Sequence, residues 1–226
     1  MAILLAELHK LERKIGIKDG FFDRLIEDDD WSFIIKLNAV IETSLSMVLT
    51  EMFTKSIKRY SPTIQKNVDF TDVFYKMQTG NEKQGKLNFV KACGILDDKS
   101  INKVIYLASI RNRLAHDIKN VNFNLLEYYN SLSNDQKKQF IEHVDITGIL
   151  TKHQVFKGRK DNYQFSSNDN GLLRLWLLLG FQSILIRLDI VHTFVNDMDQ
   201  KMDEDDRLAR GMRFLRSRLL SNLKGK

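Results

Sequence analysis

The sequence predicts an all-α protein, and three observations lead to this expectation. The 226 residues include one proline and 11 glycines, so few helix-breaking residues interrupt the chain. Hydrophobic residues make up 43% of the chain, which is enough for a substantial core. In several segments apolar residues recur every three or four positions, as one face of a helix requires. We therefore expect a helical bundle with a long C-terminal helix and a basic helical tail.

Three helices are predicted in the first half of the chain. The acidic run 28–30 is expected to cap a helix over 31–57, because carboxylates accept the unpaired amide hydrogens of a helix N-terminus. Further helices are expected over 82–93 and 97–116, whereas residues 63–80 fit a short helix or a strand. The predicted apolar face of the 31–57 helix comprises Ile34, Leu37, Ile41, Leu45, Val48 and Met52.

The second half of the chain alternates between helical and polar segments. Residues 125–150 predict two shorter helices that are separated near residues 131–134. The polar segment 152–170 is expected to form a loop or a small insertion, and 171–198 a long apolar helix. These elements suggest three parts of the chain. They are an N-terminal helical segment (1–30), a helical domain (31–199) containing the insertion, and a basic amphipathic tail (200–226).

Composition narrows the classes of function. The formal net charge of +6 is compatible with a polyanionic partner such as RNA. A single cysteine, Cys93, excludes an intrachain disulfide and a cysteine-rich metal site, and we expect it to pack as a small core residue. The most apolar run has 12 residues between Arg174 and Arg187, whereas a membrane span needs about 20. With no signal peptide evident at residues 1–14, we expect a soluble, cytoplasmic protein.

The stretch SIRNRLAHDI, residues 109–118, places an arginine where the predicted helix is apolar. At 100° per residue, Arg111 falls in the middle of the apolar arc, whereas Arg113 falls on the solvent side. An unpaired charge pointing inward would be strongly destabilising. We therefore expect either a carboxylate that pairs with Arg111, or a cleft or interface that an anion can enter. Glu42 is the preferred partner, and Asp23 and Glu51 are the other candidates.

Two further polar residues follow Arg111 on the same predicted helix. Asn112 and His116 are four positions apart, so their side chains can touch and the amide can hold one tautomer of the imidazole. From the residues alone, this pattern fits a structural ion pair with a satisfied histidine at the helix end. It also fits a site that binds an anion, although the structural ion pair is the more common arrangement.

The run GILDDKSINKVIYLASIRNRLAHD resembles the motif region of HEPN domains, especially those similar to the mannitol operon repressor. That signature is an arginine, often followed by a polar residue, and a histidine after four to six intervening residues. Arg111, Asn112 and His116 match these elements, and the similarity extends over about residues 31–125. The resemblance implies an all-α bundle that dimerises, with the two motifs facing each other. Many members are metal-independent ribonucleases in toxin, phage-defence or RNA-processing systems, and others are non-catalytic regulators or scaffolds.

RNA cleavage by the neighbouring 2′-hydroxyl suits these residue types. One group must remove the hydroxyl proton and another must protonate the leaving oxygen, and histidine can do either near neutral pH. A guanidinium can stabilise the charge that develops on the phosphate oxygens. One histidine cannot perform both steps, so cleavage to a 2′,3′-cyclic phosphate calls for a homodimer. We expect Arg111 to stabilise the transition state, His116 to act as acid or base and Asn112 to orient it. No cofactor or metal is needed, and an antitoxin or regulatory protein is a conceivable partner.

Other patterns give weaker indications. Residues 80–87, GNEKQGKL, approach a phosphate-binding loop, but Leu87 replaces the Ser or Thr that would contact Mg²⁺, which leaves nucleotide binding a third option. The acidic clusters 28–30 and 203–206 could hold a metal, although carboxylates at helix starts are commoner. The remaining histidines are expected to be structural or exposed, without ligand spacing. They are His9, His143, His153 and His192.

The basic tail is the last candidate for contact with RNA. Its arginines recur about every three residues beside apolar positions, so they could follow an RNA backbone together with Arg113. The same stripe could dock an acidic partner or form the solvent side of a packed helix. These arginines are Arg207, Arg210, Arg213, Arg216 and Arg218.

Overall fold

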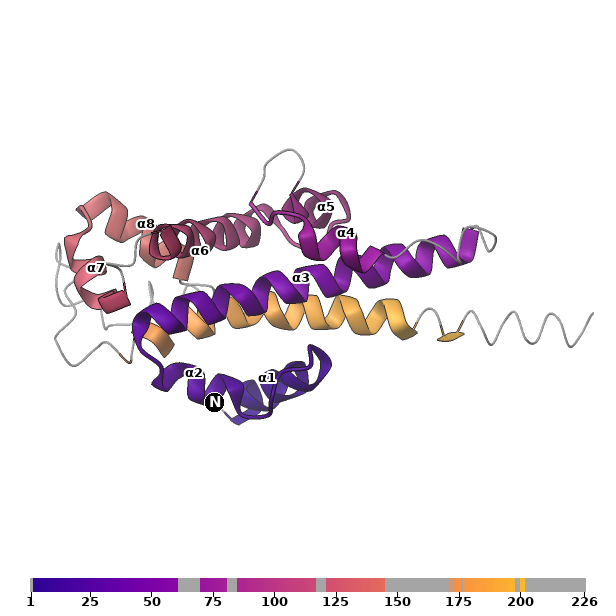
Figure 1. The fold of residues 1–226 in the computed structure, drawn as a ribbon, viewed down its shortest axis with the longest axis horizontal. Coiled ribbons are helices and arrows are strands. Elements are labelled where there is room, and N and C mark those ends of the chain that lie inside the picture. Colours follow the sequence, from indigo (N-terminus) through magenta and orange to yellow (C-terminus); the bar gives the residue numbers. More distant parts are fainter. Residues whose placement is uncertain are drawn as a thin grey trace, which may run out of the picture.

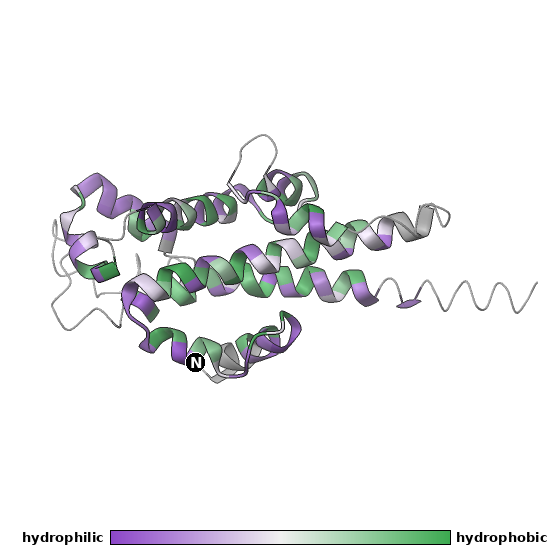
Figure 2. Cartoon of the chain, viewed as in Figure 1, coloured by the Kyte–Doolittle hydropathy of each residue, from purple (hydrophilic) through white to green (hydrophobic). Residues whose placement is uncertain are grey.

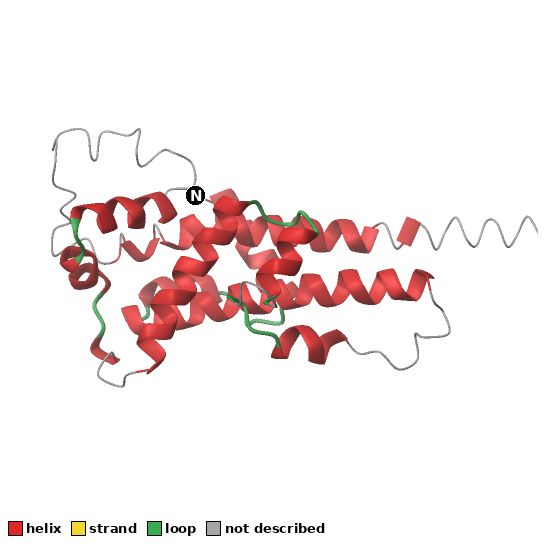
Figure 3. Cartoon of the chain, turned by 90° about the horizontal axis from the view of Figure 1, so that it is seen from above, coloured by secondary structure: helices red, strands yellow, loops and turns green. Residues whose placement is uncertain are grey.

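The computed structural model confirms the all-α class. It describes residues 2–60, 70–80, 85–116, 121–144, 171, 173–175, 177–197 and 200–201. Within these ranges the chain forms helices joined by short loops, and no strand occurs (Figure 3). The polar insertion 152–170 and the arginines of the basic tail lie outside the described residues.

The helix boundaries agree closely with the predicted segments. The undecided segment 63–80 contains the helix α4, and the predicted pair in 125–150 is α7 and α8. The helices are α1 (Ala2–Lys14), α2 (Phe21–Glu27), α3 (Asp30–Tyr60), α4 (Phe70–Lys76), α5 (Lys86–Ala92), α6 (Asp98–His116), α7 (Leu125–Ser131), α8 (Asn134–Val144) and a C-terminal helix, Leu173–Asp197.

The long helix α3 forms the axis of the molecule. The C-terminal helix lies along one side of α3, with α1 and α2 beyond it, while α4, α5 and α6 cover the opposite side (Figure 1). The C-terminal helix runs parallel to α3, because Asp30 pairs with Arg174 near one end and Glu51 pairs with His192 toward the other. By contrast α6 runs antiparallel to α3, with the indole of Trp31 donating to the carbonyl of Leu114 at 3.4 Å.

One hydrophobic core extends through all these layers. Five of the six residues on the predicted apolar face of α3 are buried, and Met52 is partly buried. Leu8 and Leu11 of α1 and Phe22 and Leu25 of α2 belong to the same cluster of buried residues. Hydrophobic residues recur along α3 and the C-terminal helix (Figure 2), and buried residues of both belong to this one cluster. The first 30 residues therefore share their core with the rest of the bundle.

Acidic side chains cap the helices that carry the core. Asp29 accepts a hydrogen bond from the backbone N–H of Ser32 at 2.9 Å, as the sequence predicts for α3, and Asp97 accepts one from the backbone N–H of Ser100 at 2.8 Å at the start of α6. At α2 the preceding residue is a glycine and offers no side chain. There the fully buried carboxylate of Glu12 accepts the amide hydrogens of residues 20 and 22 at 2.9 and 2.8 Å.

A buried carboxylate joins three helices at one end of the bundle. Asp30 is 5% exposed and accepts the backbone N–H of Leu125 at 2.7 Å, which satisfies the start of α7. Its other oxygen lies 3.3 Å from Nε of Arg174 in the C-terminal helix. The third residue of the acidic run is therefore a tertiary anchor, whereas Asp28 forms a more exposed pair with Lys36.

The prediction that Cys93 packs in the core is wrong, because Cys93 is exposed. The helix α5 ends at Ala92, and Cys93 lies in the turn where Gly94 adopts a φ of 65°. Helical periodicity therefore does not carry Cys93 onto the buried face of α5.

By length and composition alone, two helices could cross a membrane, namely Asp30–Ser56 within α3 and the C-terminal helix. Buried residues make up 61% of the apolar stretch in the first and 47% in the second. The second stretch is longer than the 12-residue run seen in the sequence because it continues beyond Arg187. A helix at the centre of a bundle meets the same two criteria, since its side chains are buried against its neighbours.

Replacing Asp30 by asparagine should lower the free energy of unfolding by about 3 kcal/mol, because Arg174 would keep its charge in a mostly buried place without a counter-ion. Denaturant unfolding measures the effect. The matched variant Asp28→Asn removes a partly exposed pair and should cost less than about 1 kcal/mol. Equal losses in the two variants would contradict the anchoring role of Asp30.

The stability should also fall with acidification through His143. Its ring stacks on Tyr106, with centroids 4.5 Å apart, and burial together with the nearby positive charge of Lys103 lowers the pKa of His143. The unfolded chain therefore binds a proton more readily, so stability is fully present above about pH 6.5 and is lost as the pH falls below it. Thermal unfolding at pH 7.5 and 5.5 should show a smaller decrease in His143→Gln than in the wild type. An identical decrease would refute this assignment.

Candidate functional site

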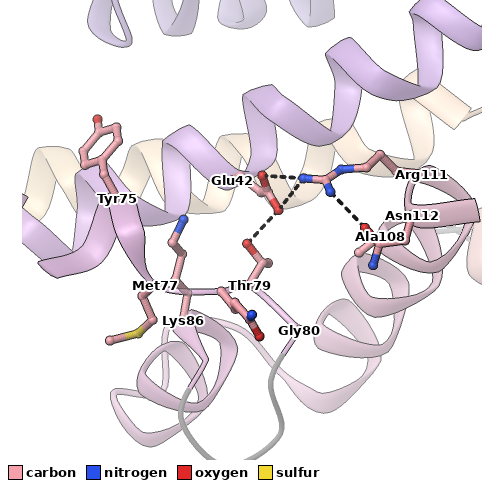
Figure 4. Close-up of a pocket in the computed structure, with 10 residues that line it drawn as sticks. Glu42, Tyr75, Met77, Thr79, Gly80, Lys86, Ala108, Arg111 and Asn112 are labelled. Atoms are coloured by element: carbon pink, nitrogen blue, oxygen red, sulfur yellow. Dashed lines mark hydrogen bonds and ion pairs between the residues drawn. The ribbon is translucent and has the colours of Figure 1, made fainter. Parts of the chain in front are cut away.

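A polar pocket lies between α3, the connection from α4 to α5, and α6. Its volume is about 480 Å³, and its walls include Glu42, Tyr75, Thr79, Lys86, Arg111 and Asn112. In Figure 4 the charged side chains point toward one another from three different helices. The antiparallel packing of α6 on α3 creates this arrangement, because it brings residue 111 beside residue 42.

Arg111 pairs with Glu42, the carboxylate that the sequence favoured. Nη2 of Arg111 lies 3.1 Å from one carboxylate oxygen and 3.3 Å from the other. The hydroxyl of Thr79 donates to the same carboxylate at 2.9 Å. The Arg111 side chain is 33% exposed and that of Glu42 is 27% exposed, so the pair forms part of the pocket wall. The guanidinium therefore has a counter-ion and remains accessible.

Asn112 contacts the arginine and not the histidine. Its side-chain oxygen accepts a hydrogen bond from Nη1 of Arg111 at 2.8 Å. In this arrangement Asn112 therefore does not orient His116, contrary to what had been expected from the sequence. Asn112 instead helps to fix the guanidinium, with Glu42 holding its other end.

His116 lies apart from the pocket. It is the last residue of α6 and is exposed. Five positions separate it from Arg111, so the two side chains leave the helix about 140° apart. The structure thus brings Arg111, Asn112 and Glu42 together but does not bring His116 to them within one chain.

Lys86 is a site residue that sequence reasoning missed. It is the first residue of α5, is only 4% exposed, and lines the pocket. Burial lowers the pKa of its ammonium group, and the nearby carboxylate of Glu42 partly opposes that shift. The one signal for Lys86 was the glycine-rich pattern of residues 80–87, which suggested a different kind of phosphate site.

No family model, curated protein or solved structure matches this chain. The similarity to HEPN domains therefore stays a prediction that depends on the motif residues themselves.

The other carboxylates considered for Arg111 have different partners. Asp23 lies 3.1 Å from the ring of His9, and Glu51 pairs with Lys55 at 3.1 Å and with His192. These contacts also account for two of the histidines, which the sequence suggested were structural or exposed.

The arginine next along α6 also has a partner. Arg113 donates to the hydroxyl of Tyr128 at 2.9 Å and lies 4.7 Å from the centre of its ring. The tail arginines proposed as RNA contacts lie outside the described residues, as does the acidic cluster 203–206. In the part of the chain that the structure describes, no three His, Cys, Asp or Glu side chains gather as a metal site would require.

A double-mutant cycle on Glu42→Gln and Arg111→Gln should give a coupling energy of about 0.5–1 kcal/mol. Both side chains remain partly exposed, and water weakens the attraction of such pairs. Denaturant unfolding of the two single variants and the double variant measures the coupling. A value of several kcal/mol would mean that the pair is a structural lock and not part of an accessible site.

Proposed function

We propose that this protein is a metal-independent endoribonuclease of HEPN type that acts as a homodimer in the cytoplasm. The observation that supports the proposal most directly is the position of Arg111. Its guanidinium is held by Glu42 and Asn112 at the wall of an open polar pocket, with one third of the side chain exposed. A guanidinium in this position can bind a phosphate that enters the pocket, with no change in the backbone of α6. The resemblance of the motif to HEPN domains further implies a role as a toxin or a phage-defence effector.

In the proposed reaction, Arg111 binds the non-bridging oxygens of the scissile phosphate. Its hydrogen bonds to Glu42 and Asn112 orient the planar guanidinium before the substrate arrives, which reduces the reorganisation needed in the transition state. One His116 removes the 2′-hydroxyl proton, the oxygen attacks phosphorus, and the 5′-oxygen leaves with a proton from a second histidine. The products carry a 2′,3′-cyclic phosphate and a 5′-hydroxyl.

The homodimer is part of this proposal for a geometric reason. His116 is exposed at the end of α6 and leaves the helix on a different side from Arg111. Two histidines are needed, and each chain supplies one in this motif. A second copy that packs against this end of α6 would bring the missing groups together.

A non-catalytic regulator or protein-interaction module is the alternative, and the Arg111–Glu42 pair is the observation that favours it. A guanidinium with a carboxylate 3.1 Å away already has its charge balanced inside one chain. In that case the motif would stabilise the contact between α3 and α6, and His116 would have no chemical role.

Incubation with single-stranded RNA in excess chelator separates the two functions. We expect wild-type protein to produce 2′,3′-cyclic phosphate ends, and His116→Ala and Arg111→Ala to lose at least about 100-fold in rate, because each removes a group that acts in the transition state. Electrophoresis and end-group mass spectrometry measure the products.

His9→Ala and Arg187→Ala are the matched controls, since each removes the same residue type from an exposed surface pair. Both should cleave at the wild-type rate. Light scattering should give twice the chain mass of 26.4 kDa for the active species. Absence of cleavage by the wild type, or equal cleavage by all variants, would leave the regulator function.

A further inference from the structure

Lys86 is a largely buried lysine that lines the pocket, and the carboxylate of Glu42 attracts its ammonium group. Its residue is 4% exposed, yet among the residues that the structure describes its ammonium group forms no ion pair or hydrogen bond. Lysine is rarely buried to this degree unless it is paired, because removing an ammonium ion from water is costly. Other nearly buried charges in this protein have direct partners, as Asp30 and Glu12 do. The Lys86 side chain lines the pocket, so an anion bound there can be its partner.

The charges in the pocket are arranged in a row. Figure 4 shows Lys86 and Arg111 on opposite sides of Glu42, with Thr79 below the carboxylate. Two cations facing one carboxylate leave a net positive charge, so the pocket favours an anion. Because Glu42 lies between the cations, a ligand that reaches both must carry two anionic groups. Between its two anionic groups the ligand needs a hydroxyl or N–H that can donate a hydrogen bond to the carboxylate of Glu42.

A nucleotide with two phosphates meets these requirements. Its two phosphates can face the two cations while a ribose hydroxyl between them donates to Glu42. The pocket volume of about 480 Å³ is within the range of about 300–1,000 Å³ that is common for small-molecule sites. The exposed ring of Tyr75 forms part of the wall on the Lys86 side and offers a surface on which a base can stack.

We propose that Lys86 binds a second phosphate, next to the one at Arg111, so that the pocket accepts two phosphates joined through one nucleoside. Consecutive phosphates of RNA and a free nucleoside 3′,5′-bisphosphate share this chemistry. The inference rests on the proposed function for the role of Arg111, whereas the role of Lys86 comes from its burial and its position in the pocket, across Glu42 from Arg111. Lys86 is a ligand-binding residue here and takes no part in proton transfer.

Binding of adenosine 3′,5′-bisphosphate tests the proposal without any cleavage. Isothermal titration calorimetry on the His116→Ala protein should give an affinity at least about tenfold higher for the bisphosphate than for adenosine 5′- or 3′-monophosphate. Lys86→Met should reduce the bisphosphate affinity to the monophosphate level. Lys91→Met is the matched control, because Lys91 belongs to the same helix but is exposed and paired with Asp98 at 2.6 Å. This control should bind like the parent protein.

Several outcomes would overturn the proposal. These are equal affinity for bisphosphate and monophosphates, unchanged binding in Lys86→Met, and equal losses in Lys86→Met and Lys91→Met. Lys86→Met should also melt no lower than the parent, because it removes a largely buried charge that forms no direct ion pair with the residues that the structure describes. A lower melting temperature with unchanged affinity would mean that Lys86 is structural. A protein that binds the bisphosphate through Lys86 but cuts no RNA would refute the proposed function alone.

A measurement on the wild-type protein decides the matter if Lys86→Met does not fold. Acetylation by a lysine-directed reagent, followed by peptide mass spectrometry, should be slowed at Lys86 by the bisphosphate and unchanged at Lys91. Equal rates at Lys86 with and without the ligand would overturn the proposal. Competition on the His116→Ala protein by an unmodified RNA oligonucleotide, which keeps its 2′-hydroxyls, identifies RNA as the natural source of the two phosphates, and its failure to compete identifies a free nucleotide. Both results agree with phosphate binding at Lys86.

Discussion

The structure depends on the burial of α3 over most of its length. Its apolar face alone cannot contact the C-terminal helix on one side and α4, α5 and α6 on the other, so small and polar residues are buried as well. Ser44 and Ser46 donate hydrogen bonds from their hydroxyls to backbone carbonyls one turn earlier, at 2.9 and 2.8 Å, which satisfies both hydroxyls within the helix. A charged side chain on a helix enclosed in this way needs a partner from a neighbouring element. Asp30 and Glu42 are two different solutions to that requirement.

The two carboxylates differ in how completely they are enclosed. Asp30 meets a backbone amide and Arg174 where three helices converge, and its side chain is 4% exposed. Glu42 also meets an arginine and a hydroxyl, but the loop between α4 and α5 leaves space beside it, and the side chain keeps 27% of its exposure. The same chemical pair is therefore an anchor in one place and the wall of a pocket in the other. Packing of the surrounding helices, and not the residue types, decides which role results.

This difference explains how far the sequence could predict the structure. The helices 31–57 and 97–116 follow from apolar spacing and acidic caps, which are local properties. The Glu42–Arg111 pair could also be predicted from the sequence, because a charge on an apolar helix face requires a counter-ion. The burial of Lys86 could not be predicted, because it arises from the way α5 packs against α3. In addition, α5 is too short for a clear periodicity. Asn112 was misassigned for a related reason, since spacing along a helix allowed contact with His116 while the actual choice depended on the neighbouring guanidinium.

The separation of Arg111 and His116 has a consequence for any chemistry at this site. A backbone helix is stiff, and Arg111 and His116 leave it about 140° apart, so they do not point toward one another. If these groups act on one phosphate, at least one of the two histidines must come from a second chain, and the pocket of one chain must open toward the end of α6 in the other. Glu42 fits such an arrangement, because it holds the guanidinium in place while the site is incomplete. A monomer would keep the pocket and its charges, and could still bind phosphates, but it would have no acid and base positioned to move protons.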